Sequence, residues 1–230
     1  MKRRFLLALC MSVLSVSLFT QPALAAAPTL TIGLIPAEDA QAMLENSKQV
    51  ISSLQDQLGM PVKPFIATDY NGIIEALRAK KLDVAYLGPF SYVLASSVAN
   101  VEAFSVAETK KNGKSFYKSL IIVRKDSGIQ NIEQLKGQTM AFVDPTSASG
   151  HLFPSAGLRK NNIDPNKYFS RVIFSGSHDA SILAVANKKV DAAAVADRIL
   201  ASAIAKGVVK ESDFNIVWAS PDIPESPMVW

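Results

Sequence analysis

Short apolar runs alternate with amphipathic stretches over most of the chain, and this alternation constrains the fold more than any other feature. The first apolar run, 30–35, ends at Pro36, and a stretch with helical apolar spacing follows over 41–58 and stops at Gly59. Further pairs of an apolar run and an amphipathic stretch continue to residue 218. This pattern is typical of βα units and predicts an α/β fold with largely parallel sheets.

A polar break at 124–128 divides the alternation into two similar series, and no low-complexity linker separates them. Two lobes joined by a hinge fit this organisation better than two unrelated domains. We therefore expect lobe 1 over 26–123 and lobe 2 over 124–226, with 227–230 as the start of a return to lobe 1. The strand expected over 120–123 closes lobe 1 in this scheme.

The N-terminus has the pattern of a secretory signal peptide. Basic residues within 1–4 precede an apolar run over 5–19, and an Ala-Leu-Ala sequence ends at Ala25. We expect cleavage after residue 25 and export to the periplasm. The only cysteine, Cys10, lies within the leader, so the mature protein would have no internal disulfide and no cysteine metal site.

The basic composition of the whole chain belongs largely to its leader. Removing 1–25 takes away three of the 24 basic residues and leaves 21 against 20 acidic ones, a net charge of +1. No basic stripe remains that would favour nucleic acid. No later apolar run is long enough to cross a bilayer. We expect a monomer with no nucleic-acid partner and no stable membrane insertion after cleavage.

One segment after a predicted strand has the composition of an anion site. In open parallel sheets ligands bind beyond the carboxyl ends of the strands, and 144–150 is a run of small and hydroxylic residues directly before a helix. Free N–H groups and the helix dipole favour an anion there, and Ser147 and Ser149 could add hydroxyl donors. The alternative is a serine N-cap without a ligand, which the local sequence alone favours.

Other polar residues follow strands on the same predicted face. His178 could donate to an oxyanion, although a lone histidine in a loop is more often structural. Asp197 could simply cap the next helix, and Tyr70 and Tyr117 could be packing residues as well as cleft donors. Each structural explanation is the better one when taken alone. Their coincidence on one face makes ligand binding a competitive interpretation.

The sequence contains no catalytic constellation. It has no H-E-x-x-H, no Walker loop and no G-x-S-x-G motif. Its two histidines, His151 and His178, have no neighbours at metal-ligand spacing. We therefore predict no catalytic residues, no metal and no cofactor.

A set of short motifs lies at 33–36, 68–74, 82–89, 117–120, 144–150, 178–187 and 220–230. Together these motifs resemble the phosphate-, phosphite- and phosphonate-binding proteins of ABC transporters. The resemblance covers nearly all of the mature chain and implies an α/β, two-lobed periplasmic-binding-protein type II clamp. Members of the family usually continue with further helices that return to lobe 1, so a chain ending at Trp230 looks C-terminally truncated.

The resemblance implies ligand-binding roles for eight residues, which are Tyr70, Tyr117, Ser147, Ala148, Ser149, His178, Asp197 and Ser226. The two tyrosines match cleft tyrosines of the family, and the histidine matches one that reaches the phosphonate oxygens. The triplet 147–149 matches a Ser-Thr-Ser sequence that holds those oxygens at a helix start.

Three of these positions depart from the family pattern. Ala148 lacks the middle hydroxyl of the triplet. Asp197 stands where aminophosphonate binders have a longer glutamate, and Ser226 stands where they have an aspartate, with Glu225 beside it. A weakened carboxylate pair holds an ammonium group poorly, so we expect phosphite or methylphosphonate to be preferred over aminoethylphosphonate.

The resemblance implies the periplasmic solute-binding component of an ABC importer that captures a small phosphorus oxyanion. Its partners would be an inner-membrane permease and the ATPase of that permease. Two alternatives belong to other classes. One is a periplasmic sensor for a membrane receptor, and the other is a phosphonate or phosphate hydrolase, which would need an activated nucleophile or a metal.

Overall fold

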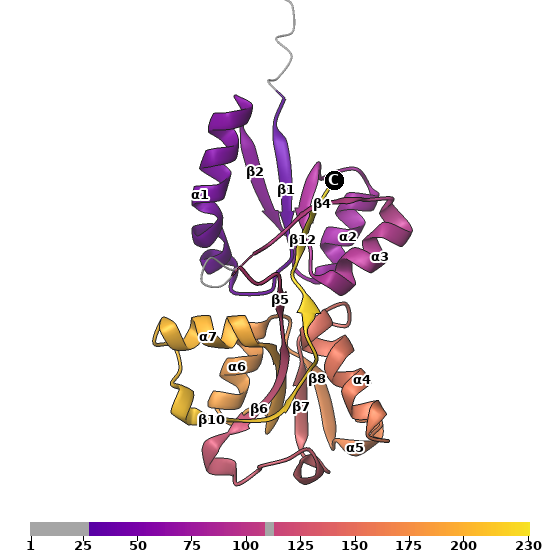
Figure 1. The fold of residues 1–230 in the computed structure, drawn as a ribbon, viewed down its shortest axis with the longest axis vertical. Coiled ribbons are helices and arrows are strands. Elements are labelled where there is room, and N and C mark those ends of the chain that lie inside the picture. The colour runs from indigo at the N-terminus through magenta and orange to yellow at the C-terminus, as the bar shows by residue number, and fades with distance from the viewer. Residues whose placement is uncertain (1–27, 109–112) are drawn as a thin grey trace, which may run out of the picture.

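The computed structural model describes residues 28–108 and 113–230. The predicted signal peptide, 1–25, lies outside the described residues. The chain forms two α/β units stacked end to end, each built on a five-stranded sheet with helices on its faces (Figure 1). We call the unit on the first sheet lobe 1 and the unit on the second sheet lobe 2. Within the described residues, no helix combines the length and the apolar character that a membrane span requires.

Lobe 1 has the strand order β2-β1-β3-β12-β4. Strand β1 runs parallel to β2 and β3, while β12 is antiparallel to β3 and β4. Its elements are β1 (Leu30–Leu34), α1 (Ala40–Leu58), β2 (Val62–Ile66), α2 (Tyr70–Arg78), β3 (Val84–Tyr86), α3 (Pro89–Ala99), β4 (Ala103–Val106) and β12 (Pro227–Val229). The helix predicted over 41–58 is therefore present as α1.

Lobe 2 has the strand order β10-β6-β9-β7-β8, in which β7 is parallel to β8 and β9 and β6 is antiparallel to β9 and β10. Its strands are β6 (Ser119–Arg124), β7 (Thr139–Phe142), β8 (Arg171–Phe174), β9 (Ala192–Ala196) and β10 (Phe214–Ala219). Its α-helices are α4 (Phe153–Lys160), α5 (Pro165–Tyr168), α6 (His178–Ala186) and α7 (Asp197–Ala205). Short 3-10 turns lie at Lys125–Ser127, Glu133–Leu135 and Glu211–Asp213.

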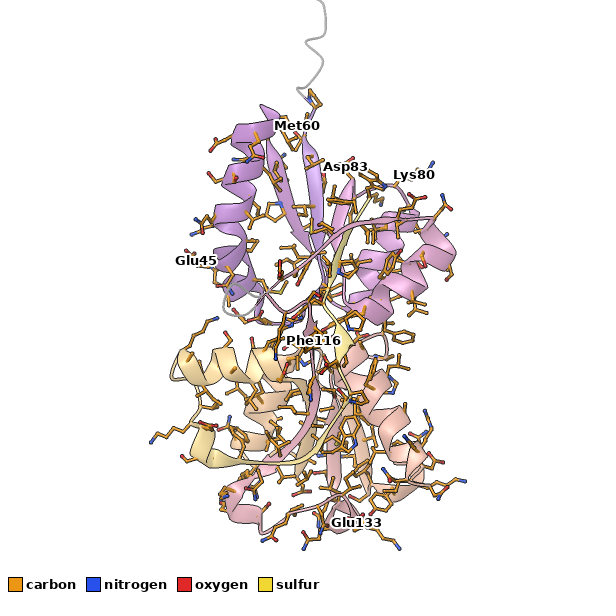
Figure 2. The ribbon with its side chains drawn as sticks, viewed as in Figure 1. Glu45, Met60, Lys80, Asp83, Phe116 and Glu133 are labelled. Atoms are coloured by element: carbon orange, nitrogen blue, oxygen red, sulfur yellow. The ribbon has the colours of Figure 1, made fainter. Side chains whose placement is uncertain are left out.

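The chain passes between the lobes on two short strands that pair with each other. Strands β5 (Phe116–Tyr117) and β11 (Ile223–Pro224) are antiparallel, with Tyr117 opposite Ile223. Figure 2 shows Phe116 between the lobes, with Met60 at the outer end of lobe 1 and Glu133 at the outer end of lobe 2. The crossing therefore consists of two strands side by side, one leading out and one leading back.

The sheets correct the lobe boundary expected at residues 123 and 124. The apolar run 120–123 belongs to β6, which pairs with β9 and β10, so the chain has already entered lobe 2 at Ser119. The physical reason is burial on both faces, since Ile121, Ile122 and Val123 are fully enclosed in the lobe 2 core. After β11 the chain re-enters lobe 1 as β12, which lies between β3 and β4.

Small residues bring the lobe 2 helices close to their sheet. Every residue of β9, Ala-Ala-Ala-Val-Ala, is buried. The side chains of Ile182 and Val185 on α6 and of Ile199 on α7 pack into the same cluster as this strand. Because alanines leave little height above the sheet, the first turns of α6 and α7 start close to the end of β9, where they face lobe 1.

A candidate ligand-binding site between the lobes

A small cavity lies between the lobes, near the crossing strands. Seven of the eight predicted residues line it, namely Tyr70, Tyr117, Ser147, Ala148, Ser149, His178 and Ser226. Its volume is about 10 Å³, roughly the space that one water molecule needs. The remaining lining residues are Ile35, Ala37, Gly88 and Arg198.

The segment after β7 forms one wall. Ser147 caps a single π-helical turn, Ala148–Leu152, and its hydroxyl accepts a hydrogen bond from the N–H of Gly150 at 3.0 Å. A Cβ at Gly150 would overlap the side chain of Val143, so only glycine allows this close approach. Single π-turns are frequent at functional sites, and the first two residues of this one, Ala148 and Ser149, line the cavity.

A buried carboxylate organises this loop. One oxygen of Asp144 accepts from the N–H and the hydroxyl of Thr146, at 2.7 and 2.8 Å. Its other oxygen accepts from the N–H of Tyr70 at 3.4 Å, at the start of α2 in lobe 1. Asp144 therefore fixes the loop of lobe 2 and contacts lobe 1 at the same point.

Two tyrosine hydroxyls enter the site from the lobe 1 side and from the crossing. Tyr70 is the first residue of α2, and Tyr117 lies on β5; both side chains are buried. Burial raises the pKa of each hydroxyl above its usual value, although hydrogen bonds with Ser147 and Ser149, respectively, oppose the shift. Both groups therefore keep their protons at neutral pH and can donate.

His178 is a neutral donor. It begins α6 and is buried, and its Nδ1 accepts a hydrogen bond from the N–H of Ala196 at 3.0 Å. The proton of the neutral ring is therefore on Nε2. Burial lowers the pKa of His178 to about 3, and the nearby positive charge of Arg198 adds to the shift. The imidazole remains uncharged at physiological pH and offers an N–H to a ligand.

Arg198 is a site residue that sequence reasoning missed. It is the second residue of α7, and its guanidinium carbon lies 4.9 Å from the centre of the Tyr117 ring. Its Nε is buried without a hydrogen-bond acceptor among the described residues and lies 3.4 Å from a carboxylate oxygen of Glu225. The rule of strand ends points to Asp197, its neighbour, but periodicity does not indicate which of two adjacent side chains at a helix start faces a cleft.

Asp197 does not line the cavity. Its carboxylate accepts from the N–H of Arg198 at 2.7 Å, and its side chain faces a neighbouring surface pocket beside Lys118. The acidic ligand contact that the resemblance implies for Asp197 is therefore absent from this geometry. The first turn of α7 presents the arginine to the cavity instead.

The segment 225–226 completes the wall next to Arg198. Ser226 lines the cavity, and its hydroxyl lies 3.4 Å from a terminal nitrogen of Arg198. The carboxylate of Glu225 is 4% exposed and also accepts from the N–H of Ser226 at 3.2 Å. Glu225 therefore lies behind the cavity wall as the counter-charge of the arginine.

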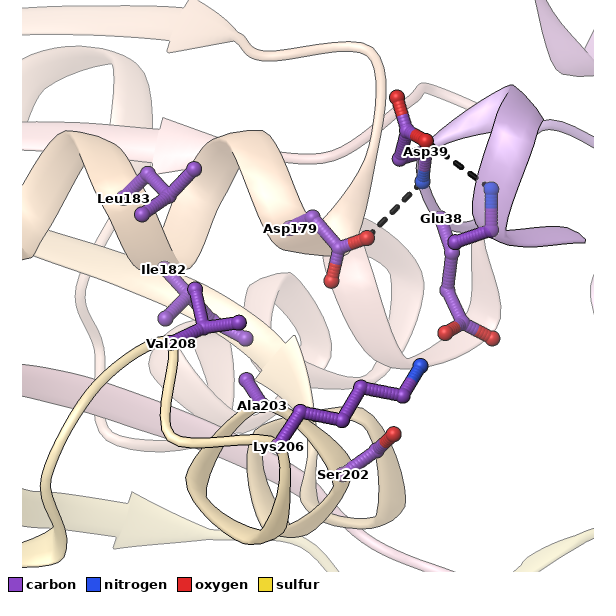
Figure 3. A pocket seen from close by; sticks show the side chains of 10 residues that line it. Glu38, Asp39, Asp179, Ile182, Leu183, Ser202, Ala203, Lys206 and Val208 are labelled. Carbon is purple, nitrogen blue, oxygen red and sulfur yellow. Dashed lines mark hydrogen bonds between the residues drawn. The ribbon is translucent and has the colours of Figure 1, made fainter.

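Direct hydrogen bonds between lobe 1 and lobe 2 also join the lobes around the cavity. The N–H of Asp39 at the start of α1 donates to the carboxylate of Asp179 on α6 at 2.9 Å, as Figure 3 shows. The N–H of His178 donates to the carbonyl of Ala37 at 2.9 Å. On the other side, the hydroxyl of Ser91 donates to the carbonyl of Thr146 at 3.0 Å. The structure is therefore a closed form of the two lobes.

Two α/β lobes that close over a small polar cavity at paired crossing strands have the architecture of periplasmic binding proteins. The family described as the periplasmic phosphonate substrate-binding protein of ABC transporters matches residues 32–230. The chain belongs to this family. The match confirms the family resemblance predicted from the sequence.

Individual relatives agree with this assignment. The chain is 35% identical over 206 residues to the phosphonates-binding periplasmic protein of Escherichia coli (strain K12), covering 87% of this chain and 60% of that protein. A binding component of an ABC phosphonate transporter from Pseudomonas aeruginosa is 34% identical with a TM-score of 0.84, covering 89% of this chain and 68% of that one. PhnD1 of Prochlorococcus marinus, solved with methylphosphonate, is 25% identical with a TM-score of 0.78, covering 87% and 75%. The predicted two-lobed α/β clamp is thus confirmed.

Proposed function

We propose that this protein captures a small phosphorus oxyanion, such as phosphite or methylphosphonate, between its lobes in the periplasm and presents it to an ABC importer. The observation that carries the proposal is the lining of the cavity. Hydroxyl donors, a neutral imidazole N–H and one guanidinium converge there, and none of the lining residues is acidic. Donors without a facing carboxylate suit an anion, and the charge of Arg198 strengthens the attraction.

Each residue of the site has a role in this proposal. The hydroxyls of Ser147 and Ser149, with the N–H groups of the turn they begin, hold the oxygens from lobe 2. Tyr70 donates from lobe 1, Tyr117 donates from the crossing and His178 donates through Nε2. Because these donors come from both lobes, a bound oxyanion would join them and favour closure.

Family membership supports transport over the alternatives. Members of the family are the substrate-binding components of transporters. We propose a binding role without bond breaking, an inner-membrane permease and its ATPase as partners, and a monomeric state. Export through the leader predicted at 1–25 would place the mature protein in the periplasm.

The proposal is tested by calorimetric titration of the mature protein, 26–230, with phosphite, methylphosphonate, phosphate and sulfate. We expect saturable binding of phosphite or methylphosphonate and no release of products from either ligand after prolonged incubation. Absence of binding to every phosphorus oxyanion would overturn the proposed ligand class. Turnover of a phosphonate ester would favour the hydrolase instead.

A further inference from the structure

We infer that Arg198, held by Glu225, is a specificity-determining residue that restricts the site to compact phosphorus oxyanions without an ammonium group. This inference rests on the proposed function, because it concerns which members of that ligand class the same cavity accepts. The selection would be made by the guanidinium of Arg198, whose side chain lines the cavity and is 31% exposed.

The contacts divide the lining into two groups. Ser147 and Ser149 lie with the tyrosine hydroxyls at the start of the π-helical turn. Arg198 and Ser226 lie together, 3.4 Å apart, with Glu225 behind them. If the phosphorus oxygens occupy the first group, the substituent on phosphorus points toward the second group and meets the guanidinium.

The guanidinium has donor capacity that the protein does not use. Its Nε is buried and lies in an ion pair with the Glu225 carboxylate at 3.4 Å, without forming a hydrogen bond. Its contact with the hydroxyl of Ser226, at 3.4 Å, is long for a hydrogen bond. An oxygen atom of the ligand would therefore gain a partner at the terminal nitrogens of Arg198, whereas an ammonium group would meet a like charge there.

Glu225 does not offer a substitute site for an ammonium group. Its carboxylate is 4% exposed, lies 3.4 Å from Nε of Arg198 and accepts from the N–H of Ser226. An ammonium group would have to displace the guanidinium from this carboxylate, so it would compete with an ion pair that the protein already forms. Asp197, the other nearby acid, faces a neighbouring pocket. No acidic residue lines the cavity itself, so an aminoalkyl substituent held within it would lie beside the guanidinium and not beside a carboxylate.

The small size of the cavity also disfavours ligands with an aminoalkyl substituent. At about 10 Å³ the cavity has room for about one water molecule. Any phosphorus oxyanion therefore requires the lobes to stay further apart than they are here, and each added substituent atom increases that separation. Size and charge must be separated experimentally. Propylphosphonate has the same chain length as 2-aminoethylphosphonate but a methyl group in place of the ammonium, so the pair differs chiefly in charge.

The experiment titrates the mature protein with methylphosphonate, propylphosphonate and 2-aminoethylphosphonate, and repeats the series on Arg198→Gln. For the wild type we expect methylphosphonate to bind most tightly and 2-aminoethylphosphonate to bind at least thirtyfold more weakly than propylphosphonate. In Arg198→Gln, which frees the carboxylate of Glu225, the ratio of the dissociation constants of 2-aminoethylphosphonate and propylphosphonate should fall by at least tenfold. The matched control Arg159→Gln changes an exposed arginine on α4 and should keep the wild-type ratio.

Loss of Arg198 leaves Glu225 buried without its partner, so the double variant Arg198→Gln/Glu225→Gln provides a second test in which neither charge remains. It should also lower this ratio, because the repulsion is gone, but by less than Arg198→Gln. The role of Arg198 is overturned if the affinity ratio between propylphosphonate and 2-aminoethylphosphonate is unchanged in both variants, or if the wild type shows no such difference. In either case, binding of methylphosphonate by the wild type still upholds the proposed function. Failure of the wild type to bind methylphosphonate overturns both.

Discussion

The backbone N–H of Ala196 donates to Nδ1 of His178, and this single hydrogen bond of 3.0 Å decides what the imidazole can do. Ala196 is the last residue of β9, and His178 is the first residue of α6. The strand end therefore sets the tautomer of a side chain on the adjacent helix. The ring is fixed as a donor through Nε2, the role that an oxyanion site requires.

The buried neutral histidine should make stability depend on pH. The pKa of His178 is about 3 in the folded protein, against 6.5 for an unperturbed histidine. Between these values the unfolded chain binds more protons, so stability is fully present above pH 6.5 and falls as the pH is lowered toward 3. One proton corresponds to a slope of about 1.4 kcal/mol per pH unit.

The measurement is the free energy of unfolding by urea between pH 7 and pH 4.5. We expect His178→Gln to reduce the slope in this range by about 1 kcal/mol per pH unit or more. His151→Gln removes the other histidine, leaves His178 in place and should keep the wild-type slope. Equal slopes in the wild type and His178→Gln would show that this imidazole is not held neutral.

The serines at the π-helical turn should dominate affinity. Each hydrogen bond to a charged group contributes about 1.5–3 kcal/mol, so Ser147→Ala/Ser149→Ala should weaken methylphosphonate binding by about a hundredfold or more. Calorimetric titration measures this change. Ser155→Ala is the matched control, because Ser155 is equally buried on α4 but does not line the cavity. Unchanged affinity in the double variant would remove this turn from the site.

The contact between Asp179 and Asp39 should contribute to closure without touching the ligand. Replacing Asp179 with alanine removes an acceptor at the N-terminus of α1, a loss of about 0.5–1.5 kcal/mol. We expect about a three- to tenfold loss of ligand affinity and a larger radius of gyration in small-angle scattering. Asp164→Ala, which removes the cap of α5 in lobe 2, should leave both quantities unchanged. A compact Asp179→Ala protein with wild-type affinity would contradict this role.

The rule that ligands bind at strand ends was a good guide to the cavity. It selected Ser147 and Ser149 after β7 and His178 after β8, because a parallel sheet brings the ends of neighbouring strands to one edge. The resemblance added Ser226, which lies at the return crossing beyond any parallel strand. These residues come together in the structure, although their ligand contacts remain a proposal.

The lobe boundary and the choice of Asp197 over Arg198 were predicted wrongly because both depend on contacts in the folded chain that a linear pattern does not contain. The apolar run 120–123 reads as a strand, but its sheet is decided by pairing with β9 and β10, which are distant in sequence. Strands β4 and β12 are short, and their pairing joins residues near 105 and 228. The choice between Asp197 and Arg198 depends on the direction of the first turn of α7, which packing against β9 determines.

Two carboxylates of lobe 2 reach backbone N–H groups at the beginnings of lobe 1 helices, Asp144 at α2 and Asp179 at α1. Both contacts involve protein groups alone, so they favour closure to the same extent for every ligand. Discrimination among ligands must then come entirely from the cavity, while these contacts set the baseline occupancy of the closed shape. An unloaded molecule in that shape shows the same exterior as a loaded one. Under the proposed transport role, these two aspartates, together with the other contacts between the lobes, would influence how often the permease is engaged without cargo.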